Sequence, residues 1–192
     1  MRVHSIAHFA VAFAAAGLLA SGGTAQGQRG TIKSADLWFD AKASLGPFRG
    51  ITHTATGQMT GGPALASVRG FVEAASTSLS TDNSIRDHDM RKTLEVEKYP
   101  AIRFDLDSVV VLAETTDSAK IELVGKLSIH GVTKSVRLPA HVRLDKSQAR
   151  VTSTFDLFLP DYKITNLKRM LGALKMQETI QVGLDVTFTI LH

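Results

Sequence analysis

The chain has 192 residues, no cysteine and a formal net charge of +4 at pH 7. This length suits one domain with a sizeable core, and the missing cysteine excludes disulfides, thiolate metal ligands and a cysteine nucleophile. The small positive excess is spread along the chain, which argues against nucleic acid as a partner.

Residues 1–25 are predicted to be a secretory signal peptide. A short positive segment at Arg2 precedes an apolar run over residues 9–20, and the Gly-Thr-Ala sequence that ends at Ala25 suits a signal peptidase. The run falls short of the roughly 20 residues that span a bilayer, so an N-terminal membrane anchor is the weaker alternative. We therefore expect residues 26–192 to form one exported domain, either periplasmic or secreted.

Most of this domain alternates apolar and polar residues with the period of two that is typical of half-buried β-strands. About eight such segments at near-regular spacing predict an all-β, mainly antiparallel fold, and the long segments with one apolar face fit a closed barrel. Gly46-Pro47 and Gly131 mark turns. The segments lie near residues 37–43, 51–59, 68–74, 102–106, 121–129, 136–144, 155–159 and 182–190.

One segment breaks the strand pattern. Polar residues that commonly cap helices precede a charged stretch, which predicts a short helix over residues 84–97. Tyr99-Pro100 then forces an extended exit. A second candidate helix over residues 167–174 has apolar residues at helical spacing but contains Gly172, so a loop or an early start of the last strand is the alternative.

Residues with catalytic or metal-binding potential cluster in the charged stretch at residues 86–89. Neighbouring side chains on a helix point in different directions, so these do not converge on one metal ion or substrate, and Asp87 fits an ordinary ion pair with Arg91. No zinc-site spacing, serine-nucleophile motif or phosphate loop occurs. We expect no metal site and no enzyme; catalysis by Asp87, His88 and Tyr162 is the least favoured alternative.

The apolar faces of the strands are the remaining candidate site. They make either a dry core or the wall of a ligand cavity, and periodicity does not distinguish the two. Gly70 and Gly125 fall mid-strand on this face, where glycine permits a bend of the barrel or, less favoured, the close approach of a ligand.

Two stretches resemble the YceI-like (polyisoprenoid-binding) family, and the resemblance extends over roughly residues 35–190. The order and spacing of the two stretches also match the family. They are Lys98–Phe104, preceded by Arg86-Asp87-x-x-Met90-Arg91, and Gly125–Val136.

The resemblance implies a lipocalin-like closed barrel of about eight strands with a short helical segment, tied to the barrel by Arg86, Asp87 and Arg91. It also implies an exported protein that holds a long isoprenoid lipid or polyprenyl quinone in its interior, with no covalent cofactor and no catalysis. The residues that we expect to line the ligand are Phe39, Val68, Gly70, Val72, Ile102, Phe104, Leu106, Leu123, Leu127, Ile129, Leu138, Phe155 and Leu157.

An apolar rim near Phe48 and Leu171 suits a transient contact with the inner membrane or a protein in it, or a homodimer. The main alternative function is a ligand-free exported module for protein interaction or stress response. Such a module would have an interior filled with large side chains.

Overall fold

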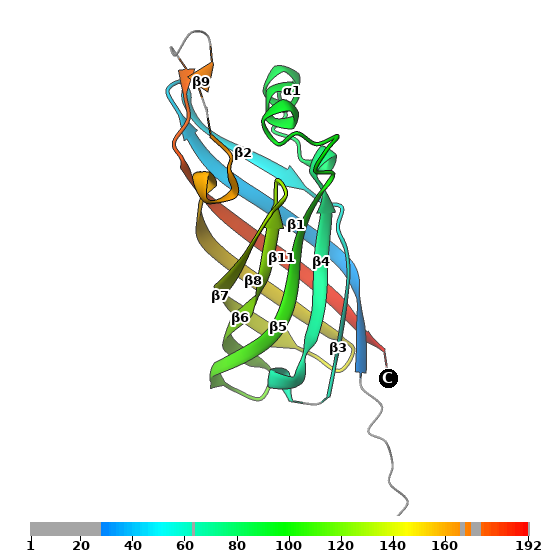
Figure 1. The fold of residues 1–192 in the computed structure, drawn as a ribbon. Coiled ribbons are helices and arrows are strands. Elements are labelled where there is room, and N and C mark those ends of the chain that lie inside the picture. Colours follow the sequence, from blue (N-terminus) through cyan, green and yellow to red (C-terminus); the bar gives the residue numbers. More distant parts are fainter. Residues whose placement is uncertain (1–27, 63, 166–167, 170–173, 192) are drawn as a thin grey trace, which may run out of the picture.

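The computed structural model describes residues 28–62, 64–165, 168–169 and 174–191. Its strands wind into a tall barrel with one helix at the upper end (Figure 1). The predicted signal peptide lies outside the described residues. The elements are β1 (Gln28–Ala43), β2 (Gly46–Thr52), β3 (Thr56–Gly61), the 3-10 helix η1 (Leu65–Ser67), β4 (Arg69–Ala75), η2 (Ser76–Ser78), α1 (Ser84–Thr93), β5 (Ala101–Glu114), β6 (Ser118–Ile129), β7 (Val132–Leu144), β8 (Gln148–Phe158), η3 (Leu159–Tyr162), β9 (Lys168–Arg169), β10 (Leu174–Lys175) and β11 (Thr179–Leu191).

Eight antiparallel strands close the barrel in the order β1-β3-β4-β5-β6-β7-β8-β11, and β11 pairs with β1 to complete the ring. The extra strand, β2, also pairs with β1. Both β2 and β3 fit along the same edge of β1 because residues 28–31 pair with β3 while residues 37–43 pair with β2. The predicted antiparallel barrel with a short helical segment is therefore confirmed.

The segment predicted as one extended stretch over residues 51–59 is two strands. The chain turns after β2, where the buried hydroxyl of Thr52 donates to Ser78 Oγ at 2.8 Å and accepts from the N–H of Thr54 at 3.1 Å. These bonds satisfy polar groups that a continuous strand would have paired with a neighbour.

The predicted helix over residues 84–97 is shorter than expected, because α1 ends at Thr93. Glu95 has a left-handed backbone with φ of 46°, and its carbonyl accepts from the N–H groups of Lys98 and Tyr99, both at 2.8 Å. The candidate helix over residues 167–174 lies largely outside the described residues, of which 168–169 and 174–175 pair as the short strands β9 and β10. Within the described part of the chain, no helix is long and apolar enough to cross a membrane.

The two predicted turns differ in outcome. His130 and Gly131 have φ values of 50° and 71° and form a two-residue hairpin between β6 and β7, as expected from the glycine. The turn assigned to Gly46-Pro47 lies at residues 44–45 instead. Gly46, with φ of 117°, already pairs with Ala43 as the first residue of β2.

Gly70 and Gly125 allow neighbouring strands to approach closely, and the bend that the sequence favoured stays a prediction. Both glycines pair with Leu106, from β4 and β6 respectively. A Cβ atom on Gly125 would lie 2.1 Å from the carbonyl oxygen of Asp105, and one on Gly70 would lie 2.1 Å from that of Gln58. No other residue type fits at either position unless the strands move apart.

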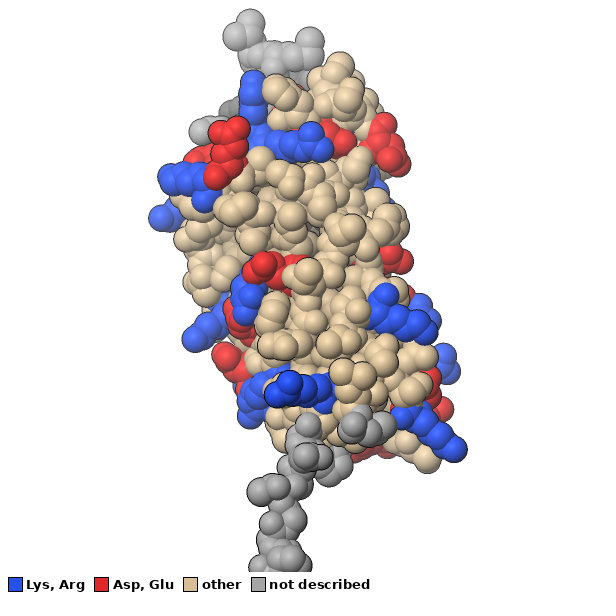
Figure 2. Space-filling model, turned by 90° about the vertical axis from the view of Figure 1, so that its right-hand side faces the viewer, with Lys and Arg blue, Asp and Glu red and all other residues tan. Residues whose placement is uncertain are grey.

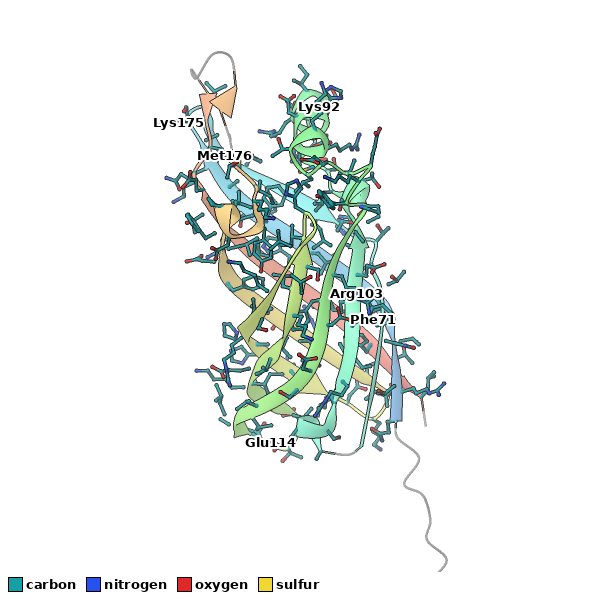
Figure 3. All side chains as sticks on the ribbon, viewed as in Figure 1. Phe71, Lys92, Arg103, Glu114, Lys175 and Met176 are labelled. Atoms are coloured by element: carbon teal, nitrogen blue, oxygen red, sulfur yellow. The ribbon has the colours of Figure 1, made fainter. Side chains whose placement is uncertain are left out.

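The outer face of the barrel carries mixed charges. Acidic and basic side chains are interspersed over the face shown in Figure 2. On the outside of β4 and β5 the Arg103 guanidinium lies 3.9 Å from the centre of the Phe71 ring (Figure 3) and pairs with Asp105 at 2.7 Å and Glu73 at 3.2 Å. Phe71 is therefore covered by a cation on the surface and takes no part in the interior.

Candidate ligand-binding cavity

A cavity of about 950 Å³ extends between the two ends of the barrel. Near α1 its wall includes Phe48 and Leu94, and at the opposite end it includes Leu65 and Leu144. One continuous space touches both ends, so the interior is an elongated tunnel. Cavities that bind small molecules in proteins typically measure about 300–1,000 Å³, which places this one at the upper end.

Every predicted lining residue except Gly70 lies on the cavity wall. Gly70 packs against β3 and does not reach the cavity. Contact of the others with a ligand stays a prediction. They are Phe39, Val68, Val72, Ile102, Phe104, Leu106, Leu123, Leu127, Ile129, Leu138, Phe155 and Leu157.

The wall also contains residues that we did not expect there. Those of β11 could have been found, because the alternation over residues 182–190 already marked an apolar face. Met90 of α1 and Leu94, which directly follows the helix, are four residues apart, a weak signal for one helix face. The sequence marked Phe48 only as part of an apolar rim, and it carries no signal for Met176, which long-range contacts bring to the mouth. The additional residues include Leu37, Phe48, Met90, Leu94, Met176, Ile180, Val182, Leu184, Val186 and Phe188.

Polar residues of the wall are confined largely to its two ends. Near α1 the wall includes Thr52, Asn83 and Thr93, and at the opposite end it includes Gln28 and Thr60. Between them, the inward faces of β5, β6, β7 and β8 contribute apolar side chains. This arrangement suits a long apolar molecule whose polar group, if it has one, lies at an end.

Two aromatic rings shape the wall near the upper mouth. Phe39 and Phe48 pack edge to face, with ring centroids 6.1 Å apart and an interplanar angle of 86°. The Phe39 ring occupies the space above Gly50, where a Cβ atom would lie 2.2 Å from a ring carbon. The absence of a side chain at Gly50 therefore leaves the space that the Phe39 ring occupies.

The helix α1 is held over this mouth by polar contacts. The Asp87 carboxylate, only 8% exposed, accepts from the Thr81 hydroxyl at 2.6 Å, the Thr81 N–H at 2.8 Å and Ser80 Oγ at 3.0 Å. The Thr81 hydroxyl is the main cause of a lowered pKa of Asp87, against the opposing effect of burial. Arg86 donates to the Thr81 hydroxyl at 2.9 Å and covers the Phe48 ring at 4.5 Å. Arg91 forms no direct ion pair with the Asp87 carboxylate, and its positive charge makes only a smaller contribution to the lowered pKa of Asp87.

A comparison with family models identifies the fold. The model of the YceI-like domain matches residues 22–188. The chain belongs to the YceI-like family. A comparison with curated proteins finds no match.

Solved structures with the same barrel are only distantly related to this YceI-like domain in sequence. BcnA from Burkholderia cenocepacia is 14% identical with a TM-score of 0.68, covering 80% of this chain and 95% of its own. A polyisoprenoid binding domain from Saccharophagus degradans, implicated in plant cell wall breakdown, is 16% identical with a TM-score of 0.68, covering 83% of this chain and 97% of its own. The Campylobacter jejuni YCEI protein is 19% identical with a TM-score of 0.59, covering 73% and 83%.

The residues considered for catalysis do not meet in this YceI-like barrel. None of Asp87, His88 and Tyr162 lies on the cavity wall. Tyr162 is the buried last residue of η3, where burial and the charge of Asp161 raise its pKa, and its carbonyl accepts from His130 Nδ1 at 3.1 Å. Among the residues that the structure describes, no three His, Asp or Glu side chains gather to hold a metal ion.

Proposed function

We propose that this YceI-like domain is a periplasmic carrier that binds a long apolar isoprenoid lipid, either a polyprenyl chain or an isoprenoid quinone, without catalysis. The observation that carries the proposal is the apolar tunnel of about 950 Å³ inside the barrel. The family and the Saccharophagus structure, described as a polyisoprenoid binding domain, support the same class of ligand.

The size of the tunnel limits the length of chain that it can hold. At roughly 30 Å³ for each carbon-sized group, about 950 Å³ accommodates about 30 carbon atoms, or about six isoprene units of five carbons. A longer chain would leave part of itself, or its polar head, outside the mouth.

The free energy of binding would come from removing the chain from water. Each buried methylene-sized group contributes about 0.8 kcal/mol, and the tunnel wall offers such contacts along its length. The wall belongs to strands that are paired around the whole ring, so little additional ordering of the protein is needed on binding. A barrel of this kind can hold an insoluble lipid in an aqueous compartment without forming or breaking a bond.

The site of action and the partners form part of the proposal. The predicted signal peptide supports export to the periplasm or beyond. A carrier of membrane lipid must exchange its cargo with a membrane or with a membrane protein, and homodimers are compatible with the proposal. The ligand-free interaction module requires a filled interior, so the tunnel favours the carrier over that alternative.

Native mass spectrometry of the protein purified from its own host tests the proposal, combined with organic extraction of the same sample. The expected result is a mass excess of several hundred daltons that extracts as an apolar molecule with a polyprenyl chain. An unliganded mass, together with no uptake of added polyprenol or polyprenyl quinone, would contradict it.

A further inference from the structure

Two large apolar side chains are exposed to solvent at the end of the tunnel where α1 lies. Leu45, in the turn between β1 and β2, is 83% exposed, and Ile85, in the first turn of α1, is 75% exposed. A single exposed leucine carries little information. Both of these residues, however, also line the tunnel, so the apolar surface of its wall continues outward onto the rim.

The turn that carries Leu45 is held in position by the backbone of Lys175, the last residue of β10, and of the two residues that follow it. The N–H of Ser44 donates to the Lys175 carbonyl at 2.9 Å, and the N–H of Gln177 donates to the Lys42 carbonyl at 2.8 Å. Ala43 also forms a β-bridge with Met176. Leu45 is therefore presented on a braced turn at the end of the barrel where Figure 3 labels Lys175 and Met176.

The same turn has a positive bias. Lys42 and Lys175 flank Leu45, both side chains are exposed, and neither forms an ion pair within the part of the chain that the structure describes. The helix α1 contains both acidic and basic residues, so the bias belongs to the turn. An exposed apolar residue between two unpaired lysines matches the boundary between acyl chains and anionic phosphates in a bilayer.

The opposite end of the barrel lacks this combination. Leu112 and Leu191 are exposed there, at 53% and 50%, but neither lines the tunnel. Charged residues occur in the tunnel wall at both ends, so the two ends differ in whether their exposed apolar side chains belong to that wall. Apolar exposure, access to the tunnel and unpaired positive charge coincide only at the upper rim among the described residues.

We propose that the rim formed by Leu45, Ile85, Lys42 and Lys175 docks onto the surface of an anionic phospholipid bilayer, with the mouth of the tunnel facing the lipid. This inference rests on the proposed function, because a carrier of membrane lipid needs a mouth that meets the membrane. Two apolar side chains and two lysines give weak, reversible attachment, and reversibility is what repeated loading and release require.

Co-sedimentation with phospholipid vesicles tests the docking surface. The vesicles are pure phosphatidylcholine or an equal mixture of phosphatidylcholine and phosphatidylglycerol. The wild-type protein should bind the mixed vesicles more strongly, and high salt should weaken that binding. The double variant Leu45→Ser, Ile85→Ser should lose about tenfold in partition coefficient. The variant Lys42→Gln, Lys175→Gln should lose its preference for the anionic vesicles.

The matched control is the double variant Leu112→Ser, Leu191→Ser, which removes similar apolar surface from the opposite end and should bind vesicles as the wild type does. Equal loss in both serine variants, or no binding of the wild type to anionic vesicles, would overturn the docking surface. Uptake of a polyprenol from vesicle-free solution by the wild type is measured in parallel. Failure of that uptake with normal vesicle binding would overturn the carrier function and leave the docking intact.

Discussion

Replacing Leu127 by tryptophan should obstruct the tunnel. Leu127 lies on β6, is 7% exposed and lines the cavity, and its strand neighbour on β5 is Phe104. A larger side chain at this position projects into the empty space, because the backbone of β6 is fixed by pairing on both sides. The tunnel accepts the extra atoms, so we expect less destabilisation than the roughly 1–3 kcal/mol typical of overpacking in a filled core.

The magnitude follows from the volume of the tunnel. Tryptophan has about six more heavy atoms than leucine, which at roughly 30 Å³ each would take at most about 180 Å³ of the 950 Å³. This space corresponds to about one isoprene unit. Expelling five carbons at about 0.8 kcal/mol each costs about 4 kcal/mol, or about a thousandfold in dissociation constant for a chain that fills the tunnel.

The assay is equilibrium binding of a series of polyprenols of increasing length to the delipidated protein. Affinity for the wild type should rise with length up to about six isoprene units. In Leu127→Trp the longest chains should lose the most affinity and the shortest the least. The control Leu112→Trp places the same side chain on the outer surface and should leave the affinity for every polyprenol unchanged. A folded Leu127→Trp protein that binds long polyprenols with wild-type affinity would refute the assignment of the tunnel as the binding site.

Three further predictions concern stability and the width of the tunnel. The pKa of Asp87 is lowered from 3.8, mainly by the Thr81 hydroxyl, so its stabilising effect is complete above about pH 3.8 and is lost as the pH falls below that value. Asp87→Asn should therefore lower the free energy of unfolding by about 1–3 kcal/mol at neutral pH. Thermal unfolding curves recorded at several pH values should then show a weaker loss of stability in acid. Gly125→Ala should lower the free energy of unfolding in urea by about 1–3 kcal/mol, because the new Cβ atom would meet the backbone of β5 at 2.1 Å. The control Gly62→Ala, whose Cβ atom would have its closest contact at 3.4 Å, should lower the free energy of unfolding less. Phe155→Ala should widen the tunnel and shift the preferred polyprenol length upward by about one isoprene unit, and an unchanged optimum would argue against Phe155 as part of the wall.

The strands and their inward faces could be predicted because the period of two is a local property. In β6 the residues that alternate in the sequence also alternate in burial, from Ile121 to Ile129. The same alternation identified most of the tunnel wall. It could not reveal that the interior is hollow, because packed cores and cavity walls use the same side chains.

Features that depend on long-range partners were not predicted. The break after Thr52 arises because β1 pairs with β2 and β3 in succession, and the early end of α1 arises from the turn at Glu95. Asp87 was expected to pair with a residue of its own helix, but it binds the segment that precedes the helix. None of these partners has a fixed spacing in the sequence.

A crystal structure of the protein purified from its own host would show whether a lipid occupies the tunnel. We expect continuous, elongated density along the tunnel, in contact with Phe104, Leu127 and Phe155. We also expect any polar head of the lipid to lie at an end of the tunnel. A tunnel that is collapsed or filled by protein side chains, or a lipid bound only on the outer surface, would contradict the proposed carrier function.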